Sequence, residues 1–188
     1  MATGNTTKNT TSANKQNAAR KAASDTIAKE EKKEQVIIPK DIDTSQLIVV
    51  KNGFHGTLVY ISSRTKEKFV WSGFGEEQEM ELKELRAAKN TSKAFFSNNW
   101  FMFDDEYKWV VDYLGVRQYY ENAVSIEEID NIFDKTPATI EKLIGKMTNG
   151  QKSSLAYRAR ELVVNGEIDS LKTISALEKS LGIELIER

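Results

Sequence analysis

The first sustained hydrophobic pattern of the chain predicts three β-strands. Each stretch is short, and polar or turn residues separate one stretch from the next. The expected strands cover residues 47–51, 54–62 and 68–71. Asn52-Gly53 lies between the first two and is typical of a tight hairpin turn, because both positions of that turn need a positive φ. The pattern therefore predicts an antiparallel meander, which must lay one face on helices because it is too small to be stable alone.

Apolar residues spaced by three and four predict helices in the rest of the chain. Ser125 with Glu128 fits a capping box, Thr136-Pro137 is typical of a helix start, and Asn149-Gly150 is typical of a helix end. The expected helices cover residues 76–89, 106–114, 126–134, 137–147, 151–164 and, after a cap at Asp169 or Ser170, the stretch up to Gly182. Short connections between the last helices imply a compact helical subdomain. The predicted fold class is therefore α+β, a small antiparallel meander packed with helices.

The predicted domain organisation begins with an N-terminal arm. The three parts are the arm, 1–36, a meander with helices and an aromatic-rich segment, 37–122, and a helical C-terminal subdomain, 123–188. The arm has no aromatic residue and almost no large aliphatic residue before Val36, so it cannot bury enough apolar surface to offset its ordering entropy. We expect it to be disordered or extended, either as a solvated tail or as an arm that orders on a neighbouring subunit. Its early basic residues Lys15, Arg20 and Lys21 are candidate partner-docking residues.

The densest aromatic stretch of the chain covers residues 95–103. Core packing is the default interpretation, since a meander with short helices needs large side chains to bury enough surface. The alternative is a partly exposed docking surface, because Trp and Phe are residue types that anchor interfaces. Under that alternative, Trp100, Phe101 and Phe103 are candidate partner-docking residues.

Composition narrows the possible chemistry. The chain has no Cys, which excludes disulfides and Cys-ligated zinc, and its single histidine, His55, excludes zinc motifs with two histidines. No nucleophile elbow is present, so we expect no enzymatic activity and no cofactor, with His55 as a structural or surface residue. The chain has 27 basic and 28 acidic residues, so its net charge is close to zero and does not attract it to nucleic acid or to anionic membranes. No apolar run resembles a secretory or transmembrane segment, so we expect a soluble protein that does not bind membranes.

A nucleic-acid-binding regulator is the alternative function. The last two predicted helices, joined by Asn165-Gly166, resemble a helix-turn-helix pair. The expected nucleic-acid contacts are Arg158, Arg160, Lys172 and Thr173. Acidic residues nearby offset these charges, whereas phosphate-driven affinity requires a net basic face. The offsetting residues are Glu161, Glu167, Asp169, Glu178 and Glu184.

Two segments, together with the arm, carry a resemblance to a known class of proteins. The segments are Tyr60-Ile61-Ser62-Ser63-Arg64-Thr65 leading to Phe69-Val70-Trp71, and Leu177-Glu178-Lys179-Ser180-Leu181-Gly182-Ile183-Glu184-Leu185. Over roughly residues 47–188 the chain resembles small structural proteins of tailed bacteriophages that infect Gram-positive bacteria. The resemblance implies a virion component of the capsid, neck or tail that is assembled in the host cytoplasm. It also implies binding to other virion proteins and to copies of itself, through the arm and the aromatic surface.

Overall fold

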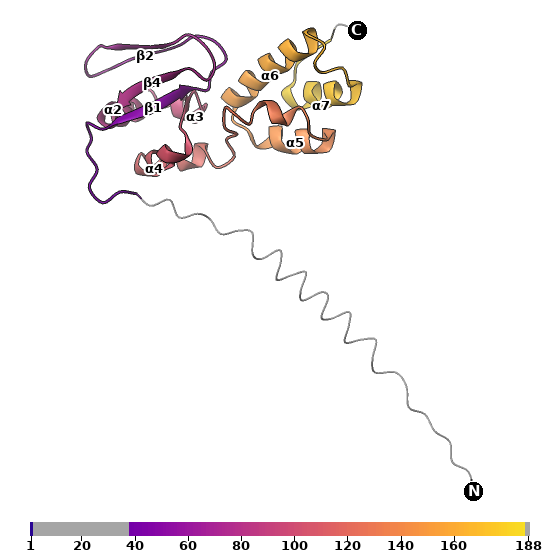
Figure 1. The fold of residues 1–188 in the computed structure, drawn as a ribbon, viewed down its shortest axis with the longest axis horizontal. Helices are drawn as coiled ribbons and strands as arrows, with labels where there is room; N and C mark the ends of the chain where they lie inside the picture. The colour runs from indigo at the N-terminus through magenta and orange to yellow at the C-terminus, as the bar shows by residue number, and fades with distance from the viewer. Residues whose placement is uncertain (2–37, 187–188) are drawn as a thin grey trace. The chain divides into compact units, whose positions relative to one another are not determined.

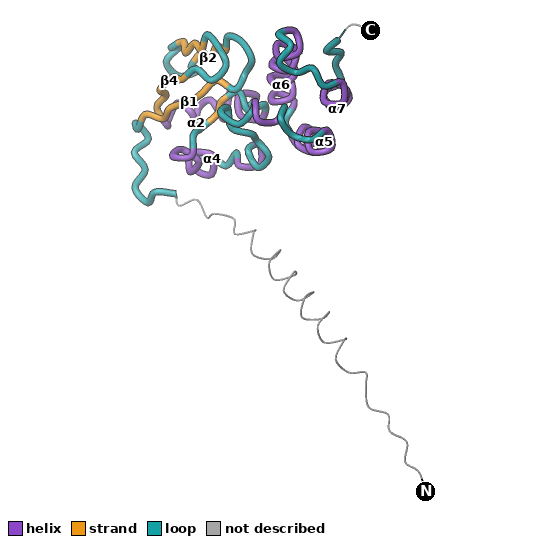
Figure 2. Tube along the Cα trace, turned by 45° about the vertical axis from the view of Figure 1, so that its right-hand side comes forward, coloured by secondary structure: helices purple, strands orange, loops and turns teal. Residues whose placement is uncertain are grey.

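The computed structural model describes Met1 and residues 38–186, which form an α+β fold (Figure 1). The predicted fold class is thereby confirmed, whereas the predicted arm, with Lys15, Arg20 and Lys21, lies outside the described residues. The strands are β1 (Leu47–Asn52), β2 (Leu58–Ile61), β3 (Lys68–Trp71), β4 (Glu77–Glu81) and β5 (Phe101–Met102). The α-helices are α2 (Leu82–Thr91), α3 (Ala94–Ser97), α4 (Lys108–Tyr113), α5 (Pro137–Lys146), α6 (Asn149–Val164) and α7 (Leu171–Leu181). Three 3₁₀ turns complete the described elements, at Asp105–Tyr107, Arg117–Tyr119 and Asp130–Ile132. Figure 2 shows the strands gathered at one part of the described chain and α5, α6 and α7 grouped at another.

The strands form two sheets rather than the single meander that the sequence predicts. In the first sheet β1 is central and pairs antiparallel with β4 and β5. In the second, β2 pairs antiparallel with β3, with Tyr60 opposite Phe69, so this part of the meander is correctly predicted. The predicted hairpin between β1 and β2 is wrong. Local alternation identifies strands, but the choice of partner depends on contacts between distant segments, which the pattern does not contain.

Asn52 and Gly53 do not form the expected hairpin turn, and another role explains both residues. The buried side chain of Asn52 donates from Nδ2 to the carbonyl oxygens of Gly56, at 2.8 Å, and Gly73, at 2.7 Å. The Gly53 N–H donates to the Trp100 carbonyl at 2.8 Å. A Cβ on Gly53 would lie 2.0 Å from the backbone oxygen of Asn99, so glycine is needed here for close approach of two backbones.

The predicted helix over 76–89 is wrong in its first part, because residues 77–81 form strand β4. Strand β4 lies along β1 with Met80 opposite Ile48, and both side chains are fully buried. Pairing with β1 therefore outweighs the helix propensity of the glutamates, and the helix begins only at Leu82.

The helices of the C-terminal part agree with the sequence in two cases and differ in two. Helix α5 begins at Pro137, and α7 is capped by Ser170 and followed by Gly182 in the left-handed region at φ 68°. The predicted helix over 126–134 is wrong: within it only Asp130–Ile132 is helical, as one 3₁₀ turn, and Ile129, Ile132 and Phe133 are all buried. Asn149-Gly150 begins α6 instead of ending α5, because Thr148 caps the helix by accepting from the Gln151 N–H.

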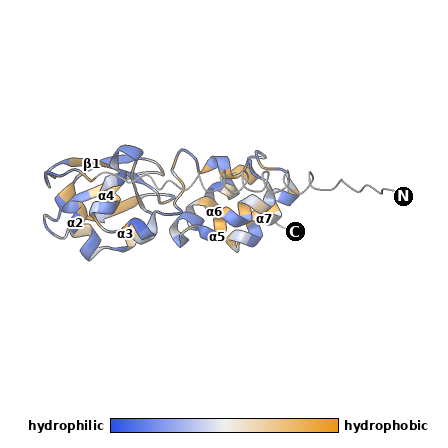
Figure 3. Cartoon of the chain, turned by 90° about the horizontal axis from the view of Figure 1, so that it is seen from below, coloured by the Kyte–Doolittle hydropathy of each residue, from blue (hydrophilic) through white to orange (hydrophobic). Residues whose placement is uncertain are grey.

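The described residues enclose two hydrophobic cores. The first lies among β1–β5, α2, α3 and α4 and is rich in aromatic side chains, with Tyr60, Trp71, Phe96 and Phe101 all almost fully buried. The second is aliphatic and lies among α5, α6, α7 and the segment that precedes them. In Figure 3 the apolar stretches of these helices alternate with polar ones, as expected for amphipathic helices that share a core.

Polar contacts join α6 to the strand-bearing part of the protein. The Ser154 hydroxyl donates to the Gly53 carbonyl at 2.8 Å, and Thr148 Oγ1 donates to Asn99 Oδ1 at 2.8 Å. Gln151 Nε2 donates to the Val124 carbonyl at 2.9 Å. A Cβ on Gly150 would lie 1.9 Å from the Asn98 backbone oxygen. Phe74 adds an apolar contact with the second core. The first turn of α6 is therefore held closely against the segment between α3 and β5.

Candidate functional site

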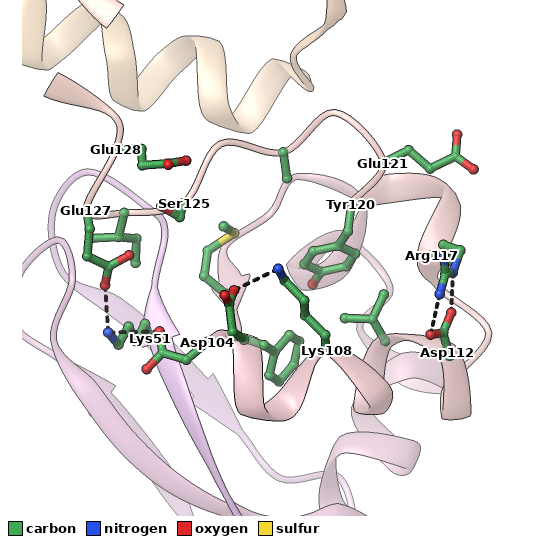
Figure 4. Close-up of a pocket in the computed structure, with 16 residues that line it drawn as sticks. Lys51, Asp104, Lys108, Asp112, Arg117, Tyr120, Glu121, Ser125, Glu127 and Glu128 are labelled. Carbon is green, nitrogen blue, oxygen red and sulfur yellow. Dashed lines mark hydrogen bonds and ion pairs between the residues drawn. The ribbon is translucent and has the colours of Figure 1, made fainter. Parts of the chain in front are cut away.

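A cleft of about 750 Å³ opens beside the end of β1, between α4 and the segment 117–128 (Figure 4). We call it the acidic cleft. Its apolar lining includes Met102 and Val111, both buried, and Phe103, which is half-buried. The charged side chains of its lining are Lys51, Asp104, Asp105, Lys108, Asp112, Arg117, Glu121, Glu127 and Glu128. Six of these are carboxylates and three are cations, so the lining has an excess of negative charge at neutral pH.

Lys51 organises one end of the acidic cleft. Its Nζ lies 2.7 Å from Glu127 Oε1, 2.9 Å from Asp104 Oδ1 and 3.4 Å from Glu77 Oε1, and its side chain is only 15% exposed. The hydrogen bond to Glu127, with that to Asp104, raises the pKa of Lys51 well above its usual value. The same hydrogen bond lowers the pKa of Glu127. One cation thus faces three carboxylates, and both members of the Lys51–Glu127 pair stay charged near neutral pH.

The opposite end of the acidic cleft contains a second fixed ion pair. Arg117 donates from Nε and Nη2 to the two carboxylate oxygens of Asp112, in the two-pronged geometry visible in Figure 4. Between the two ends, the Tyr120 hydroxyl donates to the Phe101 carbonyl at 2.7 Å, and burial raises the pKa of this phenol. Lys108 Nζ lies 2.7 Å from Asp105 Oδ1. All three cations of the lining therefore contact carboxylates of the chain itself.

A concave surface with this composition attracts cations. Low-dielectric walls focus the field of the carboxylates, which raises the local concentration of positive ligands. Glu121 and Glu128 are exposed at the rim, and Glu127 is 58% exposed although it contacts Lys51. Among the described residues, no group of three or more His, Asp or Glu side chains is arranged to hold a metal ion.

The aromatic docking candidates occupy different environments. Phe101 is fully buried on β5, where its ring lies 4.7 Å from that of Phe95 and 5.5 Å from that of Trp71, so a partner has no surface of Phe101 to contact. The docking interpretation is wrong for this residue because the first core needs its volume. Trp100 is half-buried and packs against the same core. Phe103 also packs there, but it lines the acidic cleft, where it can contact a ligand.

The residues predicted to contact nucleic acid do not form an uncompensated basic surface. Arg158 lies 2.7 Å from Asp130 and 2.8 Å from Glu161. Arg160 donates to the Glu184 carbonyl at 3.4 Å. Lys172 is exposed at the start of α7, and the backbone N–H of Thr173 is used by the Ser170 cap. Residues 123–186 contain ten acidic and eight basic side chains, so this part of the chain has no excess of positive charge to meet phosphates.

His55 lies outside the acidic cleft, in the loop between β1 and β2. Its ring stacks on Tyr157 of α6, its backbone N–H donates to the Ser154 hydroxyl at 3.2 Å, and burial lowers its pKa. A smaller cavity of about 350 Å³ lies beside it. These contacts give His55 a structural role in the joint with α6.

The acidic cleft could not be predicted from the sequence. The carboxylates at 104 and 105 fit a helix start, and nothing connected them with Lys51 or Glu127. Lys51 and Glu127 are separated by 76 positions, so only the fold brings them together. The one available signal was a lysine at the end of an otherwise apolar strand, where a charged side chain needs a partner.

None of the helices in the described part of the chain is both long and apolar enough to cross a bilayer. No protein-family model, curated protein or solved structure matches the chain.

Proposed function

We propose that this protein is a non-enzymatic binding protein whose acidic cleft receives a positively charged segment of a neighbouring protein. The observation that carries the proposal is the lining of the acidic cleft, which combines six carboxylates and three cations with apolar side chains such as Met102, Phe103 and Val111. A lysine or arginine side chain fits both parts, because its aliphatic stem covers apolar surface while its charged end meets a carboxylate.

The charge states in the acidic cleft support binding rather than proton transfer. A general acid or base works best with a pKa near the working pH. Here the pKa of Lys51 is raised and that of Glu127 is lowered, so both groups move away from neutrality. Each stabilises the charge of the other, and together they provide fixed electrostatic contacts for a ligand.

We further propose that this binding serves the virion of a tailed bacteriophage, in the capsid, neck or tail. The support for this narrower part is the resemblance carried by residues 60–71 and 177–185. The partners are then other virion proteins and copies of this chain. Mass spectrometry of purified particles tests the location, and consistent absence of this chain from the particles would refute it.

A peptide-binding experiment tests the acidic cleft itself. The probe is a fluorescein-labelled octalysine peptide, and the readout is its fluorescence anisotropy with the full chain. Exposed ion pairs each contribute about 0.2–1 kcal/mol, so Glu121→Lys with Glu128→Lys is expected to weaken binding about ten-fold. The matched control reverses two exposed carboxylates outside the cleft lining, Glu67→Lys with Asp134→Lys. Equal loss in both double variants would show that binding follows net charge, and the proposed site would be wrong.

A further inference from the structure

Strand β2 has one edge that pairs with no strand of the described part of the chain. Its only strand partner there is β3, and the β2–β3 hairpin lies at the outer margin of the strands in Figures 1 and 2. Val59 is 39% exposed and Ile61 is 59% exposed, whereas Leu58 and Tyr60, which alternate with them, are buried. We propose that this edge binds the same edge of a second copy of the chain, antiparallel and about a two-fold axis. Neither Val59 nor Ile61 lines the acidic cleft, so the inference does not rest on the proposed function.

The hydrogen bonds of the hairpin show which backbone groups of β2 point toward its open edge. Ser62, next to Ile61, donates from its backbone N–H to the Glu67 carbonyl at 2.8 Å. Positions along an antiparallel pair alternate between hydrogen-bonded and non-hydrogen-bonded. The pairs of Ile61 with Lys68 and of Val59 with β3 are therefore non-hydrogen-bonded. The backbone N–H and C=O groups of Val59 and Ile61 consequently point away from β3, toward the open edge.

A contact on the other side of β3 supports the same alternation. Val70 lies opposite Val59, and its carbonyl accepts from Nε2 of Gln78 at 3.1 Å. Gln78 belongs to β4, so the Val70 carbonyl points away from β2, as the alternation requires. This contact also places β4 against the second edge of β3, so the open edge of the two-stranded sheet is that of β2.

The composition of β2 favours pairing at this edge. Proteins usually protect an open strand edge with charged side chains, with proline or with a bulge. Residues 56–63 contain no Asp, Glu, Lys, Arg or Pro. The exposed side chains, Val59 and Ile61, are β-branched, which suits them to cross-strand pairs. An edge of this kind binds an added strand through backbone hydrogen bonds.

A second copy fits this edge because the strand is complementary to itself. With Val59 of one copy opposite Ile61 of the other, a two-fold axis generates the same pair again, and each pair can exchange two backbone hydrogen bonds. The pairing also joins the two open edges into one four-stranded sheet, whereas a strand from another protein would bring an open edge of its own.

Charge is compatible with this pairing. The nearest charged residue on the exposed face is Lys68, opposite Ile61 on β3. In the four-stranded sheet the two copies of Lys68 would lie on the outer strands, at least three strand spacings or about 14 Å apart. That separation exceeds the Debye length of about 8 Å at physiological salt, so their repulsion is screened. Because the paired strands are short, we expect a weak, reversible dimer.

A disulfide experiment tests the register, and the absence of native cysteine simplifies it. Val59→Cys and Ile61→Cys are made in separate chains, which are mixed in equal amounts and mildly oxidised. Directly opposite residues of a hydrogen-bonded pair have Cα atoms about 5.5 Å apart, within disulfide range, whereas diagonal neighbours about 7–8 Å apart lie beyond it.

The mixed disulfide, between position 59 of one chain and position 61 of the other, is therefore expected to exceed either homodimer at least five-fold. Random collision would give a ratio of only about two-fold, because two of four equally reactive combinations are mixed. A ratio near two-fold, or an excess of either homodimer, would overturn the proposal.

A charged side chain at the edge tests the location of the contact. Sedimentation equilibrium of the full chain from about 10 μM to about 1 mM covers the range of weak interfaces. Ile61→Lys is expected to raise the dissociation constant of the dimer at least ten-fold. Val164→Lys on α6 is the matched control, since Val164 is 76% exposed and the charge change is the same, and it is expected to leave the dissociation constant unchanged. A chain that stays monomeric throughout, or equal effects of the two substitutions, would overturn the proposal.

Proline at the same position tests whether the backbone makes the contact. Ile61→Pro removes an N–H that points away from β3, so the hairpin should keep its own hydrogen bonds while the dimer is lost. Ile61→Thr retains the N–H and the β-branch and is expected to keep the dissociation constant within about three-fold of the unchanged chain. Circular dichroism checks that both variants fold. Dimerisation of Ile61→Pro would show that the contact does not use the strand edge, and unfolding of this variant would show that the N–H is needed within the chain; either result would overturn the proposal.

Discussion

Substituting Gly150 by alanine tests the joint between α6 and the strand-bearing part of the protein. Gly150 lies in the first turn of α6, where propensity alone predicts that alanine stabilises the protein by up to about 1 kcal/mol. The structure predicts the opposite sign, because the new Cβ would lie 1.9 Å from the Asn98 backbone oxygen and 2.6 Å from the Asn98 Cβ. Neither atom is the end of a flexible side chain, so α6 itself has to move.

The magnitude follows from what that movement disrupts. Displacing the first turn of α6 lengthens the Ser154–Gly53 and Thr148–Asn99 hydrogen bonds, each 2.8 Å and each contributing about 1 kcal/mol. Strain from the added methyl group costs about 1–3 kcal/mol when a packed region cannot relax. After subtracting the gain in helix propensity of about 1 kcal/mol, we expect Gly150→Ala to lower the free energy of unfolding by about 2–4 kcal/mol.

Gly145→Ala in α5 is the matched control. Gly145 is an exposed helical glycine, and a Cβ there would meet nothing within 4 Å. The same substitution is expected to raise the free energy of unfolding by about 0.5–1 kcal/mol. Urea denaturation followed by tryptophan fluorescence and circular dichroism measures both changes. If Gly150→Ala proved as stable as the unchanged chain, α6 would not be held against Asn98 as described.

Three other substitutions have expected outcomes that stability measurements can check. Lys51→Met should destabilise the protein near neutral pH, since carboxylates that share one cation would then repel each other. The folded-state pKa of Glu127 lies below its unfolded value near 4.5, so the stabilising effect of its charge is present above that value and is lost as the pH falls through the folded pKa. The difference in free energy of unfolding between Lys51→Met and the unchanged chain should therefore shrink in acid. A difference that stays constant with pH would contradict this. Tyr60→Phe removes the donor that lies 2.7 Å from the buried Glu84 carboxylate and should cost about 1–3 kcal/mol in urea denaturation. Phe101→Ala should cost about 3–5 kcal/mol, whereas a loss below 1 kcal/mol would mean that Phe101 is not in the core.

Elements with strong local signals could be predicted from the sequence. The β2–β3 hairpin, the start of α5 at Pro137 and the end of α7 before Gly182 each depend on residues within a few positions of one another. Turn chemistry and helix capping act over this range, so the sequence contains the information directly.

Features that depend on distant contacts could not be predicted. The segment of β4 contains three glutamates, and it is a strand because it pairs with β1, where Ile48 lies opposite Met80. The role of Gly53 in close packing against Asn99 had no local signature. The same holds for the acidic cleft, since the apolar run of residues 47–50 placed Lys51 correctly within a strand but gave no indication of Glu127.

The hydrogen bond from Gln151 to the Val124 carbonyl connects the acidic cleft with α6, since Val124 belongs to the segment that forms one wall of the cleft. Thermodynamic linkage makes this connection reciprocal. If a ligand stabilises the wall of the cleft and thereby the first turn of α6, then destabilising that turn lowers the affinity for the ligand by the same factor. Hydrogen–deuterium exchange can follow the effect, as slower exchange at residues 149–155 on addition of octalysine. Gly150→Ala should then bind the peptide less tightly although it touches no residue of the cleft lining.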